Sequence, residues 1–518
     1  MRWFFIFFAL VLPGMPILTA MAAESGAPVT LDTAGDVETD DSGLAERYLR
    51  AGDELLGDNQ LERAADAYER SLSLGSSSLA VAERLRMAQH LAAVGRLDPA
   101  IETLRSILRE QPDDLDIRID LARYLSWNNE LLEAASEAEQ ILQQDPGNRA
   151  ALQVRANAAS WRGDFGTALP IYRQLLSVQE DFDTRLNYTH ALVGNGQIEE
   201  ARESRDLLAA SNAPQEQKLA ALDRRIKRHR PPRVLAGASR YLDSDKNDRN
   251  EYRLGAGLSL GNLDFTVEAE EVRTSDRLRS LNVKRLRLTT AMWPAMDWLS
   301  LNAGVGVAVV DDTDRDTYPI GYLGAEGVRG RLRFHADLER EVFDETAQVL
   351  SNRIRKTRAR LFSSFQYNDR WRLDANTEYE NFSDDNHGWN VELTPQYALR
   401  IANPGLRLGY RRVQAGFDRQ SGSGYFDPSR LHSNLLVFFA TLFGERLQGD
   451  VEIYAGRQST ERFDTHQQDD IIGGSGRLAV EISRHLRVET ELEGGNFSLQ
   501  SSDGFNYYLL SVNVIGSF

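Results

Sequence analysis

The chain has 518 residues, which is too long for one ordinary core and allows two to four domains, or one large barrel and a second region. Asp and Glu outnumber Lys and Arg by 77 to 60, giving a net charge of -17. This charge argues against nucleic acid as a partner, because phosphate contacts need a cationic surface. The sequence has no cysteine, which excludes disulfides, zinc-thiolate sites, iron-sulfur clusters and thiol nucleophiles. We expect neither a cofactor nor a bound metal.

The first residues are typical of a secretory signal peptide. Arg2 precedes an apolar run at residues 3–12, and small residues at positions 20–23 provide a cleavage site. A single transmembrane anchor is the alternative, but a Pro-Gly break leaves too few apolar residues to span a bilayer. We predict a signal peptide over residues 1–23 and a flexible acidic leader over residues 24–42.

Residues 43–210 contain a motif that recurs about every 34 residues. Alanines and prolines mark the period: Ala88, Ala122 and Ala156; Ala100, Ala134 and Ala168; Pro112 and Pro146. Small residues recur where paired helices must approach closely, and large ones fill the space between pairs. The segment therefore resembles the tetratricopeptide repeat (TPR) family, and we predict about five repeats, with degenerate first and last copies. A basic helical linker, residues 211–232, follows.

Two tryptophans, Trp127 and Trp161, occupy the same position in successive repeats, just before the turn between helices. One interpretation is that they pack between stacked repeats. The other is that they line a recognition surface, because a repeat solenoid has no chemistry of its own and presents side chains to a partner.

From residue 233 the helical period gives way to the alternation of β-strands. We count sixteen candidate strands over residues 233–518. The connections after even-numbered strands are short, while most after odd-numbered strands are long and polar, at residues 243–250, 420–429 and 459–469. An even strand count with short turns at one rim and long loops at the other predicts a transmembrane outer-membrane barrel of sixteen antiparallel strands.

The last strand ends the chain on an aromatic residue. Tyr508, Leu510, Val512, Val514 and Phe518 share one face of it. This pattern is similar to the C-terminal assembly signal of outer-membrane barrels. The resemblance implies outer-membrane lipid as the environment and the barrel-assembly machinery as a partner.

If the polar positions of the strands face inward, carboxylates line the lumen: Asp264, Glu268, Glu270, Asp337, Glu339, Asp374, Glu378, Glu380, Glu481, Glu489, Glu491 and Glu493. Such a wall favours cations. The alternative is that basic residues of neighbouring strands neutralise the carboxylates and only hold the barrel in register. The glutamates of residues 486–498 have few such neighbours, Arg477 and Arg487, so we expect an uncompensated acidic sector there.

We expect no enzymatic activity. His432 and Ser433 are a possible hydrolytic pair, but adjacent residues of a strand point to opposite faces and cannot act together.

The order of signal peptide, TPR repeats and sixteen-strand barrel is similar to that of the exopolysaccharide export porins, the poly-N-acetylglucosamine and cellulose-type outer-membrane porins. Two local features share in the resemblance: the Trp-bearing repeat turns, and residues 424–428, which look like the Gly-aromatic-aromatic-x-Pro segment of those barrels. The alternative for this pentapeptide is an ordinary aromatic loop. The number of repeats is smaller than those relatives usually carry.

The resemblance implies an outer-membrane export channel for an exopolysaccharide. It places the repeats in the periplasm, where they recruit the polymer or periplasmic polymer-modifying or synthase-complex proteins. The acidic sector would suit a partly deacetylated, cationic amino-sugar polymer. The alternative is an assembly scaffold in which the repeats are the working part and a plugged barrel is their outer-membrane anchor.

Overall fold

The computed structural model describes residues 41–228, 232–260, 263–292, 296–311, 315–444, 446–483, 485–496 and 506–518. The predicted signal peptide and the leader up to residue 40 lie outside the described residues. The chain divides into two compact units, Met1–Asn128 and Asn129–Phe518. Among the described residues, no helix combines the length and the apolar character that a membrane span requires.

The described part of the first unit is helical. Its elements are α3 (Asp41–Gly57), α4 (Leu61–Gly75), a short 3-10 turn (Ser76–Ser78), α5 (Val81–Ala93), α6 (Leu97–Glu110) and α7 (Leu115–Trp127). Tyr68 is fully buried beside Leu49 and Met87, and its hydroxyl donates to Asp53 at 2.7 Å. Gly52 leaves the space that this ring needs, because a Cβ there would lie 2.5 Å from the ring.

The second unit begins with the remaining helices: α8 (Leu131–Gln144), α9 (Arg149–Trp161), α10 (Phe165–Val178), α11 (Phe182–Gly194), α12 (Ile198–Asp206) and α13 (Ala213–Arg228).

The repeat is visible in the backbone of both units. One residue in each turn between paired helices has a positive φ, in turn Asn59, Gly95, Asn129, Gly163 and Gly196. Glycine and asparagine tolerate this left-handed conformation, which explains why they recur there. The small residues that mark the period are fully buried: Ala64, Ala88, Ala100, Ala122, Ala134, Ala156, Ala168 and Ala201. Their predicted role at close helix contacts is confirmed.

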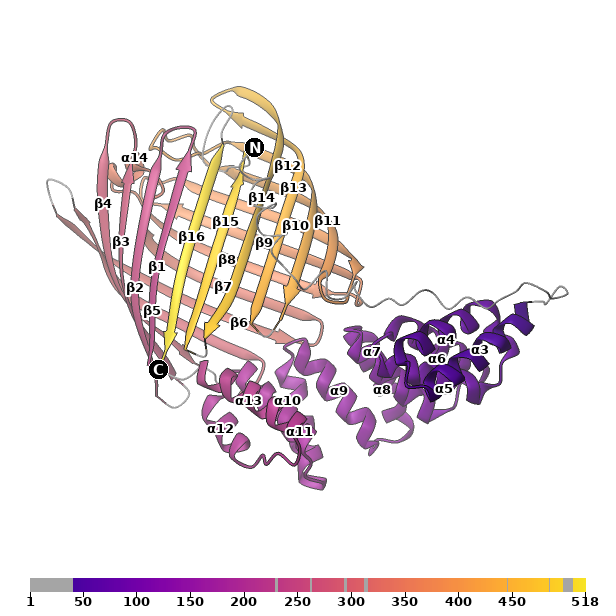
Figure 1. The fold of residues 1–518 in the computed structure, drawn as a ribbon. Helices are drawn as coiled ribbons and strands as arrows, with labels where there is room; N and C mark the ends of the chain where they lie inside the picture. The colour runs from indigo at the N-terminus through magenta and orange to yellow at the C-terminus, as the bar shows by residue number, and fades with distance from the viewer. Residues whose placement is uncertain are drawn as a thin grey trace. The chain divides into compact units, whose positions relative to one another are not determined.

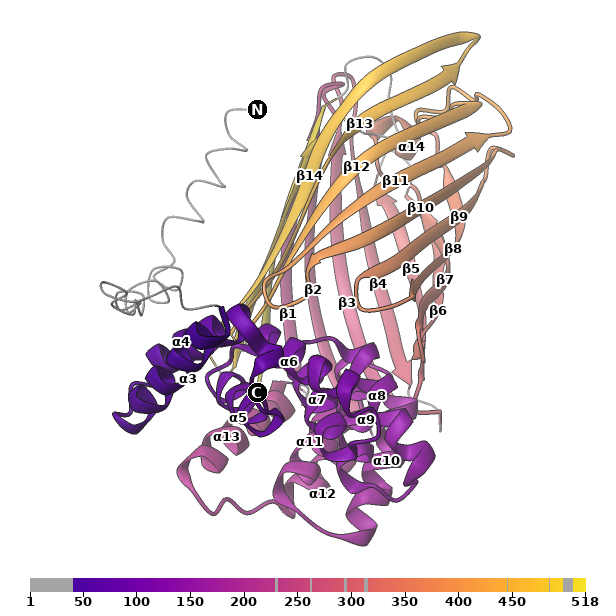
Figure 2. The ribbon, with the colours of Figure 1, turned by 90° about the vertical axis from the view of Figure 1, so that its right-hand side faces the viewer.

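The described remainder of the second unit is a closed barrel of sixteen antiparallel strands, as predicted (Figures 1 and 2). The strands are β1 (Arg233–Asp243), β2 (Asp248–Leu260), β3 (Leu263–Ser275), β4 (Ser280–Met292), β5 (Leu299–Asp311), β6 (Asp316–Arg329), β7 (Leu332–Val342), β8 (Arg355–Gln366), β9 (Trp371–Phe382), β10 (His387–Arg400), β11 (Gly405–Phe417), β12 (Arg430–Phe443), β13 (Leu447–Arg462), β14 (Thr465–Ser483), β15 (Leu486–Gly495) and β16 (Tyr507–Ser517). Strand β1 pairs with both β2 and β16, which closes the ring.

The two ends of the barrel differ. Connections after even-numbered strands are short turns, and we call their end the short-turn rim; the other end is the long-loop rim. A five-residue helix, α14 (Ala347–Ser351), lies in the connection between β7 and β8 at the long-loop rim. Two of the predicted long loops are wrong. Residues 244–247 alone connect β1 to β2 where a loop was predicted at 243–250, and β13 and β14 extend through residues 459–469 to a tight turn at Phe463 and Asp464. The polar residues there belong to a hairpin beyond the apolar belt, so their composition resembled a loop.

The barrel's outer face is apolar. On β2, the exposed residues Leu254, Leu258 and Leu260 alternate with less exposed polar or small ones, and this alternation continues around the ring. Exposed aromatics stand near the strand ends, such as Trp371 at the short-turn rim and Tyr508 toward the long-loop rim. An apolar belt between aromatic girdles is the outer surface of an outer-membrane barrel.

Candidate functional site

The predicted carboxylates of β3, β7 and β9 occupy the face opposite the apolar belt, so they line the lumen. Most carry a basic partner, in five pairs: Asp264–Arg233 at 3.3 Å, Glu270–Arg285 at 2.7 Å, Asp337–Arg360 at 2.9 Å, Glu339–Arg358 at 2.7 Å and Glu380–Lys356 at 3.0 Å. Asp374 pairs with Arg372 of its own strand at 2.8 Å. Glu268 and Glu378 form no ion pair within the described residues. Cross-strand pairing therefore neutralises most of this sector.

The acidic sector of β15 is different. Glu489 pairs with Arg487 at 2.7 Å. Glu493 instead accepts a hydrogen bond from the Tyr507 hydroxyl at 2.6 Å. Among the described residues, Glu491 has no ion-pair partner within 4 Å. Carboxylates therefore exceed cations along this strand.

Two other residues singled out from the sequence, Glu481 and Arg477, lie on β14, the strand that pairs with β15. Glu481 lies on β14 opposite Arg487 in the strand register. Arg477 lies opposite Glu491 but forms its ion pair with Asp450 of β13, at 3.1 Å. The one cation facing the middle of the acidic sector is thus already engaged.

The sequence analysis missed an arginine of β11 that binds carboxylates of two other strands. Arg411 of β11 binds Glu392 of β10 at 3.0 Å and Glu452 of β13 at 2.7 Å. These residues stand at inward positions of three strands. The alternation of polar and apolar residues along a strand indicates only that such side chains face inward. Their pairing depends on the strand register and on the length of the Arg411 side chain.

The two repeat tryptophans are half exposed, Trp127 at 52% and Trp161 at 51%. Trp127 stacks on Tyr124 within its own helix, with ring centroids 5.5 Å apart. Neither is a buried packing residue, so each is available on the surface of its own unit.

Within the second unit, the repeats are tied to the short-turn rim of the barrel. Both carboxylate oxygens of Asp369, in the β8–β9 turn, accept from the first-turn amides of α8, those of Leu132 and Glu133, at 2.9 Å each. Asp369 thus caps a helix that belongs to another domain. Asp164 accepts from the amide of Gly330, in the β6–β7 turn, at 3.1 Å. Trp161 consequently stands three residues from a contact with the rim.

The connection between β7 and β8, residues 343–354, extends from the long-loop rim to the inner wall on the side of β2 and β4. Asp344 forms ion pairs with Arg285 of β4 at 2.5 Å and with Arg249 of β2 at 3.4 Å. Burial alone would raise the pKa of Asp344, but these two guanidinium groups hold it at about 2. Through Ala347 and Leu350, α14 packs into a buried apolar cluster with inward-facing residues of the wall: Val272, Leu281, Val283, Ala308, Val310, Ile320 and Val342.

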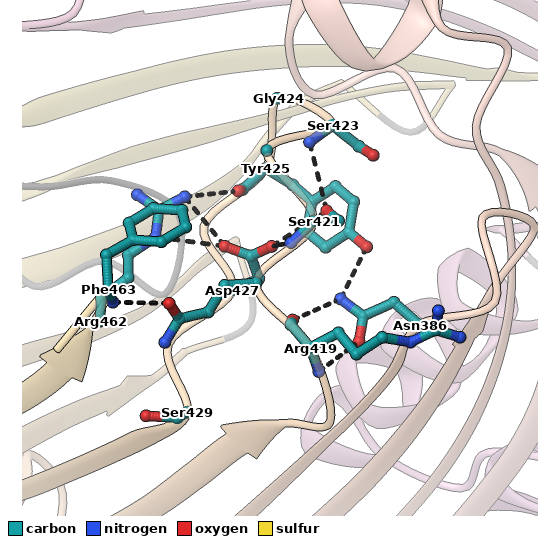
Figure 3. A network of polar contacts seen from close by, with 12 residues as sticks. Asn386, Arg419, Ser421, Ser423, Gly424, Tyr425, Asp427, Ser429, Arg462 and Phe463 are labelled. Atoms are coloured by element: carbon teal, nitrogen blue, oxygen red, sulfur yellow. Dashed lines mark hydrogen bonds and ion pairs between the residues drawn. The ribbon is translucent and has the colours of Figure 1, made fainter.

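The connection between β11 and β12, residues 418–429, contains the Gly-Tyr-Phe-Asp-Pro segment, and Figure 3 shows its polar contacts. Tyr425 and Phe426 are buried, and Asp427 is 0% exposed. The Asp427 carboxylate accepts from Arg462, the last residue of β13, at 2.9 Å, and from the Ser421 hydroxyl at 3.0 Å. The segment is therefore a packed structural element, and the sequence signal that marked it was its two adjacent aromatics.

Tyr425 connects this loop to its neighbours. Its ring stacks on Phe382 at 4.6 Å between centroids and meets Phe343 at 5.8 Å. Its hydroxyl accepts from the Asn386 side-chain amide at 2.9 Å (Figure 3). The same hydroxyl donates to the Asp384 carboxylate at 3.1 Å, and both partners lie in the β9–β10 turn.

The two loops are joined to each other. Side chains of the first loop donate to three successive carbonyls of the second: Thr346 to Gly424 at 3.0 Å, Gln348 to Gly422 at 3.3 Å and Asn352 to Ser423 at 2.9 Å. We call residues 343–354 and 418–429 together the mouth bridge.

The mouth bridge crosses the lumen. Its contacts run without a break from Arg285 on β4, through Asp344, Phe343, Tyr425 and Asp427, to Arg462 on β13. In the sixteen-strand ring, β4 and β13 are nine strands apart in one direction and seven in the other, so they stand on nearly opposite walls. The acidic sector of β15 lies on the shorter of these two arcs.

The comparisons with known proteins agree with this architecture in part. The tetratricopeptide repeat family matches residues 91–158. A search of curated protein sequences finds no match. The chain thus has a TPR region followed by an outer-membrane-type barrel.

Among solved structures, the chain is similar to a bacterial polysaccharide outer membrane secretin, at 12% identity and a TM-score of 0.45, over 55% of this chain and 98% of that one. It is also similar to CdiB from Acinetobacter baumannii, at 8% identity and a TM-score of 0.34, over 55% of this chain and 60% of that one. A tetratricopeptide repeat protein from Parabacteroides merdae shares 15% identity at a TM-score of 0.31, over 35% of this chain and 71% of that one.

Proposed function

We propose that the protein is an outer-membrane export channel for an exopolysaccharide, a partly deacetylated amino-sugar polymer. A sixteen-strand barrel encloses an aqueous lumen wide enough for an extended sugar chain. The repeats precede β1, which begins at the short-turn rim, so in this proposal that rim faces the periplasm and the repeats recruit the polymer or the proteins that synthesise and modify it. No step of this function requires a cofactor or catalysis.

The observation that carries the proposal is the excess of carboxylates on β15. Glu491 has no cation within 4 Å among the described residues, and Glu493 is bound by a neutral hydroxyl. The field of these groups reaches about 8 Å at physiological ionic strength, which is comparable to the half-width of the lumen. A cationic sugar chain would be attracted to this wall, whereas a neutral or anionic chain would not.

The test replaces Glu489, Glu491 and Glu493 with glutamine, which keeps side-chain size and removes charge. We expect the barrel to assemble, its cation preference in planar bilayers to weaken, and secretion of the polymer to fall. The control replaces exposed carboxylates of the repeats, Glu54→Gln and Asp58→Asn, and should leave the cation preference of the barrel unchanged. Unchanged selectivity and secretion in a correctly inserted triple variant would contradict the proposal.

A second candidate function is favoured by the mouth bridge. Two loops that cross the lumen would suit an outer-membrane anchor for a TPR scaffold, in which nothing passes through the barrel. Deletion of residues 420–426, which removes the middle of the second loop, should raise ion conductance through the purified barrel under both functions. A permanently closed barrel separates them, because export predicts that polymer secretion stops and the scaffold predicts normal function of the cells.

A further inference from the structure

The two halves of the mouth bridge are anchored to different parts of the molecule. The first loop, residues 343–354, is bound to the barrel wall because Asp344 is held by Arg249 and Arg285. Removing one member of a buried ion cluster leaves the others uncompensated, so moving this loop away from the wall is strongly unfavourable. Burial of α14 against the apolar cluster on the inner wall adds to this attachment.

The second loop, residues 418–429, is held by the tips of other loops and by Phe426, which is buried with Val413, Ala415 and Leu431 of the barrel wall. Its carbonyls at positions 422–424 accept only from neutral side chains, and water can replace such hydrogen bonds at little net cost. Two glycines with positive φ, Gly422 at 63° and Gly424 at 103°, flank Ser423. Glycine is required at 424, because a Cβ there would lie 2.5 Å from the Gln348 side chain.

One ion pair connects the second loop to β13. Arg462 binds the Asp427 carboxylate at 2.9 Å and the Tyr425 carbonyl at 3.2 Å, and its guanidinium lies 5.2 Å from the Phe426 ring centroid. Three consecutive residues of the loop are thus held by a single side chain. Asp427 is fully buried, so its charge is compensated only while Arg462 is in place.

We propose that the mouth bridge is a gate: residues 343–354 are its fixed half, residues 418–429 are its moving half, and the Asp427–Arg462 pair is the latch that holds it closed. This inference rests on the channel function proposed above. Release of the latch frees residues 425–427, and separation from the fixed half then breaks the three neutral hydrogen bonds and the apolar cluster that Tyr425 forms with Phe343, Val349 and Ile354.

The test measures opening frequency of the purified full-length protein in planar bilayers. Asp427→Asn removes the latch charge with little change of shape, and we expect openings to become about tenfold more frequent, because the charged hydrogen bonds between the Arg462 guanidinium and the fully buried Asp427 carboxylate are lost. The matched control is Asp450→Asn, which breaks an ion pair of similar length, 3.1 Å to Arg477, on the lumen wall away from the bridge. It should leave the opening frequency unchanged.

A reversible lock supplies the second arm. The chain has no cysteine, so Asn352→Cys and Ser423→Cys introduce the only thiols. The Asn352 side chain donates to the main-chain carbonyl of Ser423 at 2.9 Å. The Ser423 hydroxyl donates to Asp384, so the thiol introduced at position 423 must turn away from Asp384 to reach the one at position 352. Added to Asp427→Asn, the oxidised pair should suppress the extra openings, and reduction should restore them.

The outcomes separate the gate from the channel. Suppose that Asp427→Asn opens no more often than the control while deletion of residues 420–426 produces steady conductance. The proposed latch role of the Asp427–Arg462 pair is then wrong, and the proposed channel function is retained. If the deletion variant inserts correctly and does not conduct, both the gate and the proposed channel function are wrong.

Discussion

Arg285 joins two carboxylates in the interior of the barrel. It is 4% exposed and binds two carboxylates from different elements, Glu270 at 2.7 Å and Asp344 at 2.5 Å. The low pKa of Asp344 means that this contact contributes stability above about pH 4, the ordinary range of an aspartate, and loses it as the pH falls through about 2. The contact is therefore intact at any physiological pH.

Arg285→Met should destabilise the barrel by about 3–5 kcal/mol, because two buried carboxylates lose their partner. The measurement is unfolding of the purified barrel in urea and detergent, followed by heat-modifiable gel mobility. Arg477→Gln is the control, since its pair with Asp450 is largely exposed and is worth about 1 kcal/mol or less. Equal stability of the two variants would show that the buried cluster does not support the barrel.

Among the elements, the first loop of the mouth bridge carries a carboxyl that titrates near neutral pH. Burial raises the pKa of Glu345 to about 7; Lys356 opposes the rise, and Glu380, Glu341 and Asp344 add to it. The phenol of Tyr241 on β1 also faces this group. Because the pKa is raised in the folded loop, protonation stabilises the loop, and that stability is lost as the pH rises through about 7.

The wild-type channel should consequently open more often at pH 8 than at pH 5.5. Glu345→Gln, which mimics the protonated carboxyl, should keep the low frequency at both values. Bilayer recordings at the two pH values check this prediction. A wild-type channel whose openings do not depend on pH in this range would contradict it.

The repeat helices contain buried residues that stabilise the fold and exposed residues that form a surface. Trp161→Ala removes an exposed ring and should change the stability of the repeats by no more than about 0.5 kcal/mol while weakening polymer binding. Tyr172→Ala removes a fully buried ring and should cost about 3–5 kcal/mol. Chemical unfolding and binding of glucosamine oligomers, measured on the full chain, distinguish the two. A large loss of stability in Trp161→Ala would make Trp161 a packing residue.

The two ends of the barrel sequence lie at the same rim. The chain enters β1 and leaves β16 at the short-turn rim, where the Phe518 amide donates to the Pro232 carbonyl at 3.2 Å. The Phe518 side chain is 74% exposed, so it adds little to the packing of the closed barrel. We therefore expect this exposed ring to matter for assembly and not for packing.

Deletion of Phe518 should therefore reduce insertion into the outer membrane and leave the stability of barrel that does insert nearly unchanged. Quantification of inserted protein in outer-membrane fractions, together with heat-modifiable mobility, gives both readouts. Normal insertion of the truncated chain would remove the assembly interpretation, and a destabilised inserted barrel would point to packing.

Periodic features of the fold were predictable from the sequence, and the mouth bridge was not. The 34-residue repeat and the two-residue alternation each sum a weak preference over many positions, which is why Ala134 and Glu270 could be assigned to a buried helix contact and an inward strand face. Helix α14 has five residues and no period, and the partners of Asp344 and Asp427 are 59 and 35 positions away in the chain. Such contacts depend on the closed ring, which brings distant loops to one mouth.

The central claim, that polymer leaves the cell through this lumen and past the mouth bridge, is tested most directly by secretion from cells that carry only the Asn352→Cys, Ser423→Cys variant. We predict that secretion stops when the disulfide forms and resumes when it is reduced, with the amount of inserted barrel constant. Secretion at the wild-type level with the disulfide fully formed would contradict the claim.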